Sequence, residues 1–202
     1  MNKLTSRLSI FFTTSILLVL VTSCAVPPPV PEDNYYQLPK PTVKAQPTAL
    51  ADELAVKRLV SDGLHGERAL LFSTAGQSLQ LRQYHYHHWT DTPPRMLQEY
   101  LISALRQAKV AGTVINYDPG QRTALTLSGK IRHFEQVERG NKNEVFVEVE
   151  LQLHDKQHKI VHLRDYRVTQ TAKSDKPHDL VSAYGEAMNI IINEFIEDWH
   201  KI

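Results

Sequence analysis

A long alternation of apolar and polar side chains near residue 150 is the feature that most constrains the fold of this chain. In the segment NEVFVEVELQLHD (143–155), every second residue is Val or Leu, while Glu148, Glu150 and Gln152 point the other way. The apolar positions are Val145, Val147, Val149, Leu151 and Leu153. Side chains alternate between the faces of a strand, so this run predicts a strand with one buried and one wet face. Similar alternation at 123–138 and 160–172 predicts an antiparallel meander of three long strands.

Two segments instead place their apolar residues three and four positions apart, which predicts amphipathic helices. The first covers 91–110, where Asp91 or Thr92 can cap and Pro93 and Pro94 suit a first helical turn. Its apolar stripe is Met96, Leu97, Tyr100, Leu101, Ala104, Leu105 and Ala108. The second covers 178–201, and its stripe is Leu180, Val181, Tyr184, Ala187, Met188, Ile191, Ile192, Phe195 and Trp199.

Shorter strands are expected before and between these elements. They fall at NYYQLP (34–39), LAVKRLV (54–60), RALLFS (68–73), SLQLRQYHYHHW (78–89) and TVINY (113–117). The fold class that follows is α+β: a two-layer sandwich with a mostly antiparallel sheet and two amphipathic helices on one face.

The N-terminus has the order of a secretory signal. Lys3 and Arg7 precede an apolar run of about a dozen residues, shorter than the roughly 20 that a membrane-spanning helix needs. Val-Thr-Ser-Cys at 21–24 resembles the bacterial lipobox, which predicts cleavage before Cys24 and lipidation of this single cysteine. The alternative is an ordinary signal peptide with an incidental cysteine. More than one acyl chain gives stable anchoring, so a lipidated Cys24 predicts a membrane-bound protein.

These features divide the chain into a signal peptide (1–23), a lipidated Cys24 with a Pro-rich tether and a short first strand (24–52), and a globular domain (53–202).

The residue after Cys24 indicates which membrane holds the protein. An Asp at this position would favour retention at the inner membrane, whereas Ala25 resembles the outer-membrane pattern. We therefore predict that the protein is anchored at the periplasmic face of the outer membrane. Cleavage removes Lys3 and Arg7 and so lowers the formal charge of +1 by two. That near-neutral charge does not suggest a nucleic-acid partner.

Few residues form a pattern typical of catalysis or cofactor binding. His85 and His87 lie on one face of an expected strand, with His88 beside them, but the sequence shows no third and fourth ligand, so we predict no metal site there. A metal-sensing or pH-sensing role of this histidine run stays open. Glu148 with Glu150, and Glu194 with Asp198, lie on polar faces and are expected to be solvated. The chain has no Gly-x-Ser-x-Gly, P-loop or Gly-x-Gly-x-x-Gly motif. We therefore predict no enzyme activity, no catalytic residues and no cofactor.

Several blocks together resemble the ABC-type transport auxiliary lipoprotein family. They are the lipobox, YYQLP (35–39), the block LRQYHYHHWTDTPPRMLQEYLISALRQAKV (81–110), SGKIRHFEQV (128–137), VFVEVELQL (145–153) and the C-terminal helix. The resemblance is to the outer-membrane lipoprotein of paraquat-inducible, MCE-domain transport systems. It implies a non-enzymatic accessory of lipid transport between the inner and outer membranes that supports envelope integrity, with an MCE-domain periplasmic protein as partner.

The resemblance also suggests which residues meet that partner. Tyr84, Tyr86 and Trp89 match the family's aromatic block and are candidate partner-binding residues, with packing of the strand-to-helix corner as the alternative role. A homo-oligomer is compatible with this interpretation. Two other functions remain open from the sequence: a periplasmic lipid-binding carrier, and an envelope-assembly scaffold.

Overall fold

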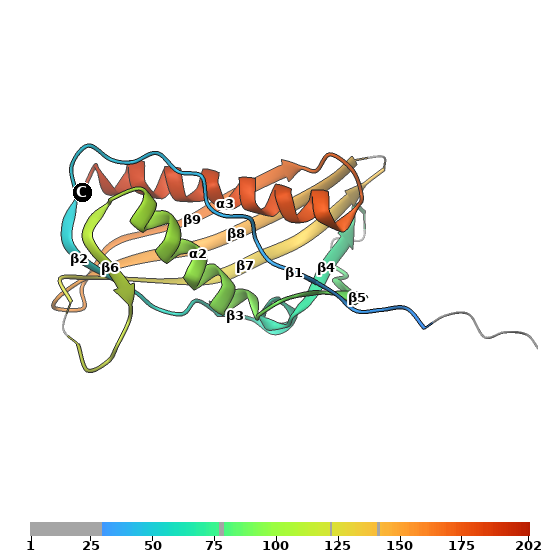
Figure 1. Cartoon of the computed structure of the whole chain (residues 1–202), viewed down its shortest axis with the longest axis horizontal. Helices are drawn as coiled ribbons and strands as arrows, with labels where there is room; N and C mark the ends of the chain where they lie inside the picture. The colour runs from blue at the N-terminus through green and yellow to red at the C-terminus, as the bar shows by residue number, and fades with distance from the viewer. Residues whose placement is uncertain (1–29, 77–78, 122, 141) are drawn as a thin grey trace, which may run out of the picture. The chain divides into compact units, whose positions relative to one another are not determined.

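The computed structural model describes residues 30–76, 79–121, 123–140 and 142–202 (Figure 1). The predicted signal peptide, Cys24 and most of the Pro-rich segment lie outside these residues. A compact unit spans Asp33–Ile202. Within the described residues no helix is both long and apolar enough to cross a membrane.

The described part of the unit contains one sheet of nine strands, two α-helices and a 3-10 helix. The strands are β1 (Asn34–Tyr36), β2 (Ala51–Val56), β3 (Val60–Ser61), β4 (Ala69–Thr74), β5 (Arg82–Trp89), β6 (Ala111–Asn116), β7 (Leu125–Arg139), β8 (Lys142–Asp155) and β9 (Ile160–Thr171). The helices are η1 (Gly63–Gly66), α2 (Pro93–Gln107) and α3 (Pro177–Trp199). The α+β class is confirmed.

The predicted antiparallel meander is also confirmed. β8 pairs antiparallel with β7 on one edge and with β9 on the other, along most of its length. The alternate apolar residues of β8, from Val145 to Leu153, are at most 1% exposed. The local alternation therefore identified both the strand and its buried face.

The prediction of a mostly antiparallel sheet is wrong, because the sheet is mixed. Beyond the meander, β7 pairs in parallel with β2, β3 and β4 in turn. β2 with β6 and β1 with β5 are parallel as well, and β4 with β5 is antiparallel. Segment 51–74 thus runs along β7 in the same direction. A half-buried strand shows the same alternation in either direction, so the sequence pattern could not distinguish these pairings.

Both helices lie against the same, concave face of the curled sheet (Figure 1). α2 packs on β6 and β2, and α3 packs on β8 and β9. α2 begins at two prolines after the extended Thr92, as predicted. The predicted stripe of α3 is buried along its whole length, and that of α2 is buried except for the partly exposed Met96. Side chains of the two helices therefore fill the hollow of the sheet.

The connector 37–50 has no regular secondary structure but packs on both helices. The Thr42 N–H donates to Asn189 Oδ1 at 3.0 Å, and the Gln46 N–H donates to the Ala108 carbonyl at 2.7 Å. Pro39 lies against Gly185 of α3, where a Cβ would be only 2.3 Å from the Pro39 Cγ. The glycine is thus needed for the close approach of the connector to the helix.

Candidate functional site

Trp89, a predicted partner-binding residue, lies in the core at the end of β5. Its side chain is 1% exposed, and its ring centroid lies 5.4 Å from that of Phe134 and 5.3 Å from that of Tyr184. Tilted and edge-to-face arrangements at these separations are favourable aromatic packing. In this structure Trp89 therefore packs the strand-to-helix corner, while direct contact with a partner stays a prediction.

Tyr84 and Tyr86 differ in how much of their side chains a partner could reach. The hydroxyl of the half-buried Tyr84 donates to Gln136 Oε1 at 2.6 Å, and its ring lies 4.7 Å from that of Phe72. Burial raises the pKa of Tyr84 above its ordinary value. Tyr86, in contrast, is 43% exposed. Of the three candidates, Tyr86 has the side chain most accessible to a partner.

The histidines of β5 take separate partners. His87 Nδ1 lies 2.9 Å from the Tyr36 hydroxyl, and His88 Nε2 lies 3.5 Å from Asp33 Oδ1. Among the described residues, His85, His87 and His88 do not form a set of three converging metal ligands. Their proximity in sequence is therefore not matched by convergence in space.

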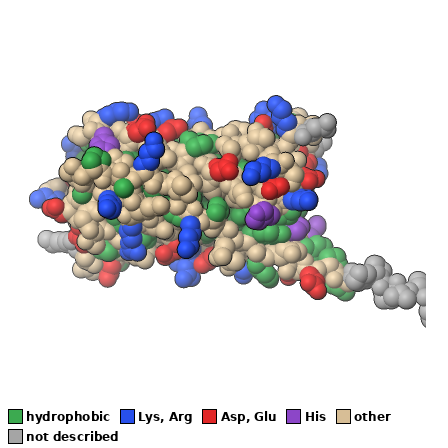
Figure 2. Space-filling model, turned by 45° about the horizontal axis from the view of Figure 1, so that its top comes forward, with side chains coloured by type: hydrophobic (Ala, Val, Ile, Leu, Met, Phe, Trp, Pro, Cys, Tyr) green, Lys and Arg blue, Asp and Glu red, His purple; other side chains and the backbone are tan. Residues whose placement is uncertain are grey.

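Two exposed tyrosines lie on the paired strands β1 and β5: Tyr35, on the face opposite Trp89, and Tyr86, two residues before His88 along β5. Tyr35 of β1 pairs in register with His88, and their rings are 5.7 Å apart. The Arg68 guanidinium lies 5.3 Å from the Tyr35 ring centroid, a cation–π distance. We call Tyr35, Tyr86, His88 and Arg68 the outer aromatic patch. Histidine and hydrophobic side chains also gather at this end of the domain in Figure 2.

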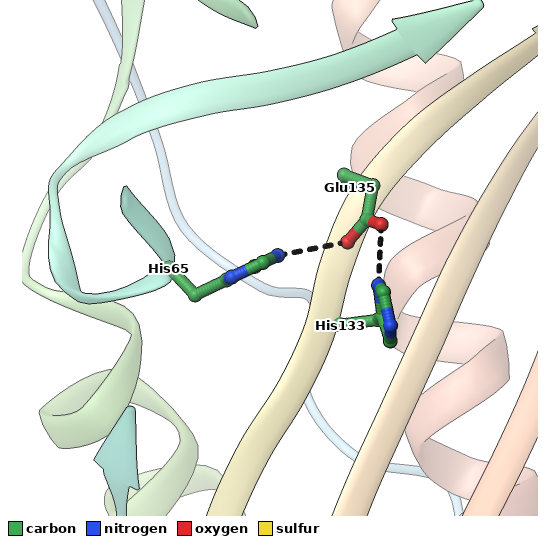
Figure 3. Close-up of side chains that lie close together, drawn as sticks. All are labelled: His65, His133 and Glu135. Atoms are coloured by element: carbon green, nitrogen blue, oxygen red, sulfur yellow. Dashed lines mark hydrogen bonds and ion pairs between the residues drawn. The ribbon is translucent and has the colours of Figure 1, made fainter. Parts of the chain in front are cut away.

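A second group of side chains converges on β7, and the sequence analysis missed it. His65, His133 and Glu135 place one ligand atom each within 4.8 Å of one another (Figure 3). His65 comes from η1, which packs on β7, whereas His133 and Glu135 are two residues apart on that strand. We call these three residues the His–His–Glu cluster.

A β-bulge brings His133 and Glu135 to the face where the cluster forms. The β7–β8 register shifts between Ile131 and His133. Before the shift, Ile131 points into the core; after it, Phe134 does, with 2% exposure. An extra residue in a strand exchanges the faces of all residues beyond it. His133 and Glu135 therefore point away from the helices, although unbroken alternation would have aligned them with Ile131.

Glu135 accepts three hydrogen bonds, two from the histidines of the cluster and one from a backbone N–H. His65 Nε2 is 3.0 Å from its Oε2, His133 Nδ1 is 2.7 Å from its Oε1, and the Phe134 N–H donates to Oε2 at 2.7 Å. Glu135 is 5% exposed, so burial by itself raises the pKa of its carboxyl. The hydrogen bonds and charges of the two histidines outweigh burial and hold that pKa below its ordinary value. The cluster thus contains a buried, ionised carboxylate.

The carboxylate pairs predicted to be solvated each lie beside an arginine. Glu150 pairs with Arg132, and Glu148 Oε1 lies 2.9 Å from the Nε of Arg167 on the adjacent strand. Arg164 of β9 joins Glu194 and Asp198 of α3. The prediction of solvation is wrong for Glu148, which is only 9% exposed, whereas the Glu194 side chain is 40% exposed.

Comparison with known proteins gives a match to one family. The model described as "ABC-type transport auxiliary lipoprotein component" matches residues 36–194. The fold resembles the crystal structure of a Xanthomonas campestris protein of the DUF330 family, with a TM-score of 0.69, 17% identity, and coverage of 81% of this chain and 92% of that one. A second crystal structure, of an uncharacterized protein, matches with a TM-score of 0.65, 15% identity, and coverage of 83% and 99%. No curated protein matches the chain.

Proposed function

This chain belongs to the ABC-type transport auxiliary lipoprotein family, and from that premise we propose that it is a non-enzymatic, membrane-anchored component of an MCE/ABC-type lipid transport system. The observation that carries the proposal is the extent of the match, because residues 36–194 include nearly all of the compact unit Asp33–Ile202. The proposed cargo is lipid moving between the inner and outer membranes.

In this proposal, lipid on Cys24 holds the chain at the periplasmic face of the outer membrane, and segment 25–33 is the spacer between the anchor and the domain. Acyl chains on one residue would keep the domain permanently at the membrane surface. The domain itself would contact an MCE-domain periplasmic protein, while the ATPase and the permease would be separate chains.

The outer aromatic patch is the surface we propose for the partner. Tyr35 is 55% exposed and Tyr86 is 43% exposed, and both lie on strands at one end of the sheet. Tyr and Arg are enriched at protein interfaces because their side chains combine apolar area with polar groups. Tyr86 belongs to the block that gave the family resemblance, which connects this surface with the shared function.

The proposal is tested by affinity capture from the native envelope. The acylated chain should fractionate with the outer membrane and co-purify with an MCE-domain protein, whereas Cys24→Ser should lose the membrane location. Tyr86→Ala should weaken capture of the partner. Ile160→Ala is the matched control, since Ile160 is 47% exposed but lies at the start of β9, far along the sheet from β5. Consistent absence of MCE-domain proteins from the native capture would refute the proposal.

A lipid-binding carrier is the second candidate, and one pocket favours it. Seven residues from the C-terminal end of α3, the neighbouring strand ends and the end of the connector line an open, mostly apolar hollow of about 400 Å³. They are Leu50, Leu125, Leu153, Val161, Trp199, His200 and Ile202. A carrier should retain lipid through purification, which native mass spectrometry would detect. Lipid-free protein that still captures an MCE-domain partner would favour the first function.

A further inference from the structure

We propose that the His–His–Glu cluster binds a divalent transition-metal ion, with Zn²⁺ as the best match. The site does not depend on the transport role, because it rests on the geometry of His65, His133 and Glu135 alone. Two imidazoles and one carboxylate form a ligand set that zinc uses in proteins. Imidazole nitrogen also favours Zn²⁺ over Mg²⁺ or Ca²⁺, which prefer sites made of oxygen.

The spacing of the ligand atoms suits such an ion. Zinc bonds to His nitrogen and carboxylate oxygen are about 2.0–2.2 Å, so tetrahedral ligands lie about 3.3–3.5 Å apart. In the structure, His65 Nε2 lies 3.0 Å from Glu135 Oε2 and His133 Nδ1 lies 2.7 Å from the other carboxylate oxygen, Oε1. One ligand atom from each of the three residues lies within 4.8 Å of the other two. Small rotations of the side chains would open the two short contacts to the distances that zinc requires.

The surroundings hold the ligands in place before any ion arrives. The Phe134 N–H orients the Glu135 carboxylate, and the His133 ring packs 4.8 Å from that of Phe146 on β8. The two neighbouring basic residues are engaged elsewhere, because Lys130 pairs with Asp62 and Arg132 pairs with Glu150. Supporting contacts of this kind fix the orientation of metal ligands and raise affinity.

Metal binding and the observed hydrogen bonds are alternatives at the same atoms. In the metal-free cluster, His65 Nε2 and His133 Nδ1 face the carboxylate and can donate their N–H to it. To bind an ion through these atoms, each histidine must be neutral and carry its proton on the ring nitrogen that does not face the carboxylate. A histidine that is protonated on both nitrogens must first release one proton. The apparent affinity should therefore fall as the solution is acidified.

With three protein ligands, a tetrahedrally coordinated ion has one coordination position left for water or for a donor atom of another molecule. The ion would also join η1 to β7, since His65 belongs to the helix and the other two ligands to the strand. It should stabilise the folded chain, because a ligand that binds only the folded state shifts the unfolding equilibrium.

The test is a Zn²⁺ titration of the full-length chain in detergent, with Cys24→Ser to remove the thiol and an affinity tag without histidine. Calorimetry gives the stoichiometry, and Co²⁺ absorption reports tetrahedral coordination. We expect one ion per chain and a rise in the unfolding temperature with Zn²⁺ but not with Mg²⁺. His133→Gln and Glu135→Gln should each weaken binding by at least about 100-fold, because loss of even a supporting contact costs 10–100-fold.

His85→Gln is the matched control, since it removes an exposed histidine from the β5 run and leaves the cluster intact. The His133 side chain is 44% exposed, so His133→Gln should fold even if Glu135→Gln does not; far-UV circular dichroism checks this. Absence of saturable Zn²⁺ binding by the wild-type cluster would overturn the proposal. So would binding that survives His133→Gln unchanged, or that is lost in His85→Gln.

Discussion

Replacement of Trp89 by Ala separates a packing role from a partner-binding role for the aromatic block of β5. The Trp89 side chain is 1% exposed and lies between Phe134 and Tyr184. Truncation of a buried Trp removes its favourable burial and leaves a cavity, which together cost about 3–5 kcal/mol. Its two aromatic contacts account for about 0.5–1.5 kcal/mol each within that total. For a domain of this size, we expect the unfolding temperature to fall by roughly 6–20 °C.

Tyr86→Ala is the comparison within the same strand. Tyr86 is 43% exposed, so its truncation should change the free energy of unfolding by about 0.5 kcal/mol or less, as is usual for surface positions. Urea unfolding followed by far-UV circular dichroism measures both variants. Fluorescence is unsuitable because Trp89 is one of two tryptophans in the chain.

Capture of the partner by folded variants completes this test. Trp89→Phe retains an aromatic ring in the core and should capture the MCE-domain protein normally, while Tyr86→Ala should not. The reasoning would be refuted if Trp89→Ala unfolded within about 1 kcal/mol of the wild type, since a loss that small is typical of an exposed site. A folded Trp89→Phe chain that loses its partner would instead show that Trp89 contacts it.

Three further predictions concern stability. The pKa of Glu135 is lower in the folded chain than its ordinary value of 4.5, so the ionised carboxylate stabilises the fold at pH values above 4.5. This stabilisation is lost as the pH falls through the lower, folded-state pKa. Below about pH 4.5, the urea midpoint should therefore fall more steeply for the wild type than for Glu135→Gln. Gly129→Ala would place a Cβ 2.6 Å from the Glu150 carbonyl oxygen, so the β7–β8 pair must shift; we expect a loss of about 1–3 kcal/mol in thermal unfolding, and an unchanged stability would contradict this. Gly185→Ala would clash with Pro39 and loosen the connector, seen as faster proteolysis within 37–50; the double variant with Pro39→Ala should restore resistance, and no restoration would refute the contact.

The candidate sites show how far sequence reasoning reaches at the level of single residues. The aromatic block around Tyr86 was visible because its residues are neighbours in the chain. The His–His–Glu cluster was not, because His65 is 70 positions from Glu135. One local signal did exist: His133 and Glu135 are two residues apart in an expected strand and so share a face. The third ligand and the true direction of that face could come only from the tertiary structure.

The sequence by itself determined where the long strands and both helices lie, and it determined the buried faces of β8 and of the helices, because side-chain periodicity is a local property of the backbone. The alternation of Val145 to Leu153 and the stripe from Leu180 to Trp199 needed no knowledge of the rest of the chain. Tertiary structure decided the direction in which 51–74 pairs with β7, and the bulge before His133 that reverses the faces beyond it. Strand direction and register depend on contacts between distant segments. One inserted residue exchanges inside for outside without changing the composition of the strand.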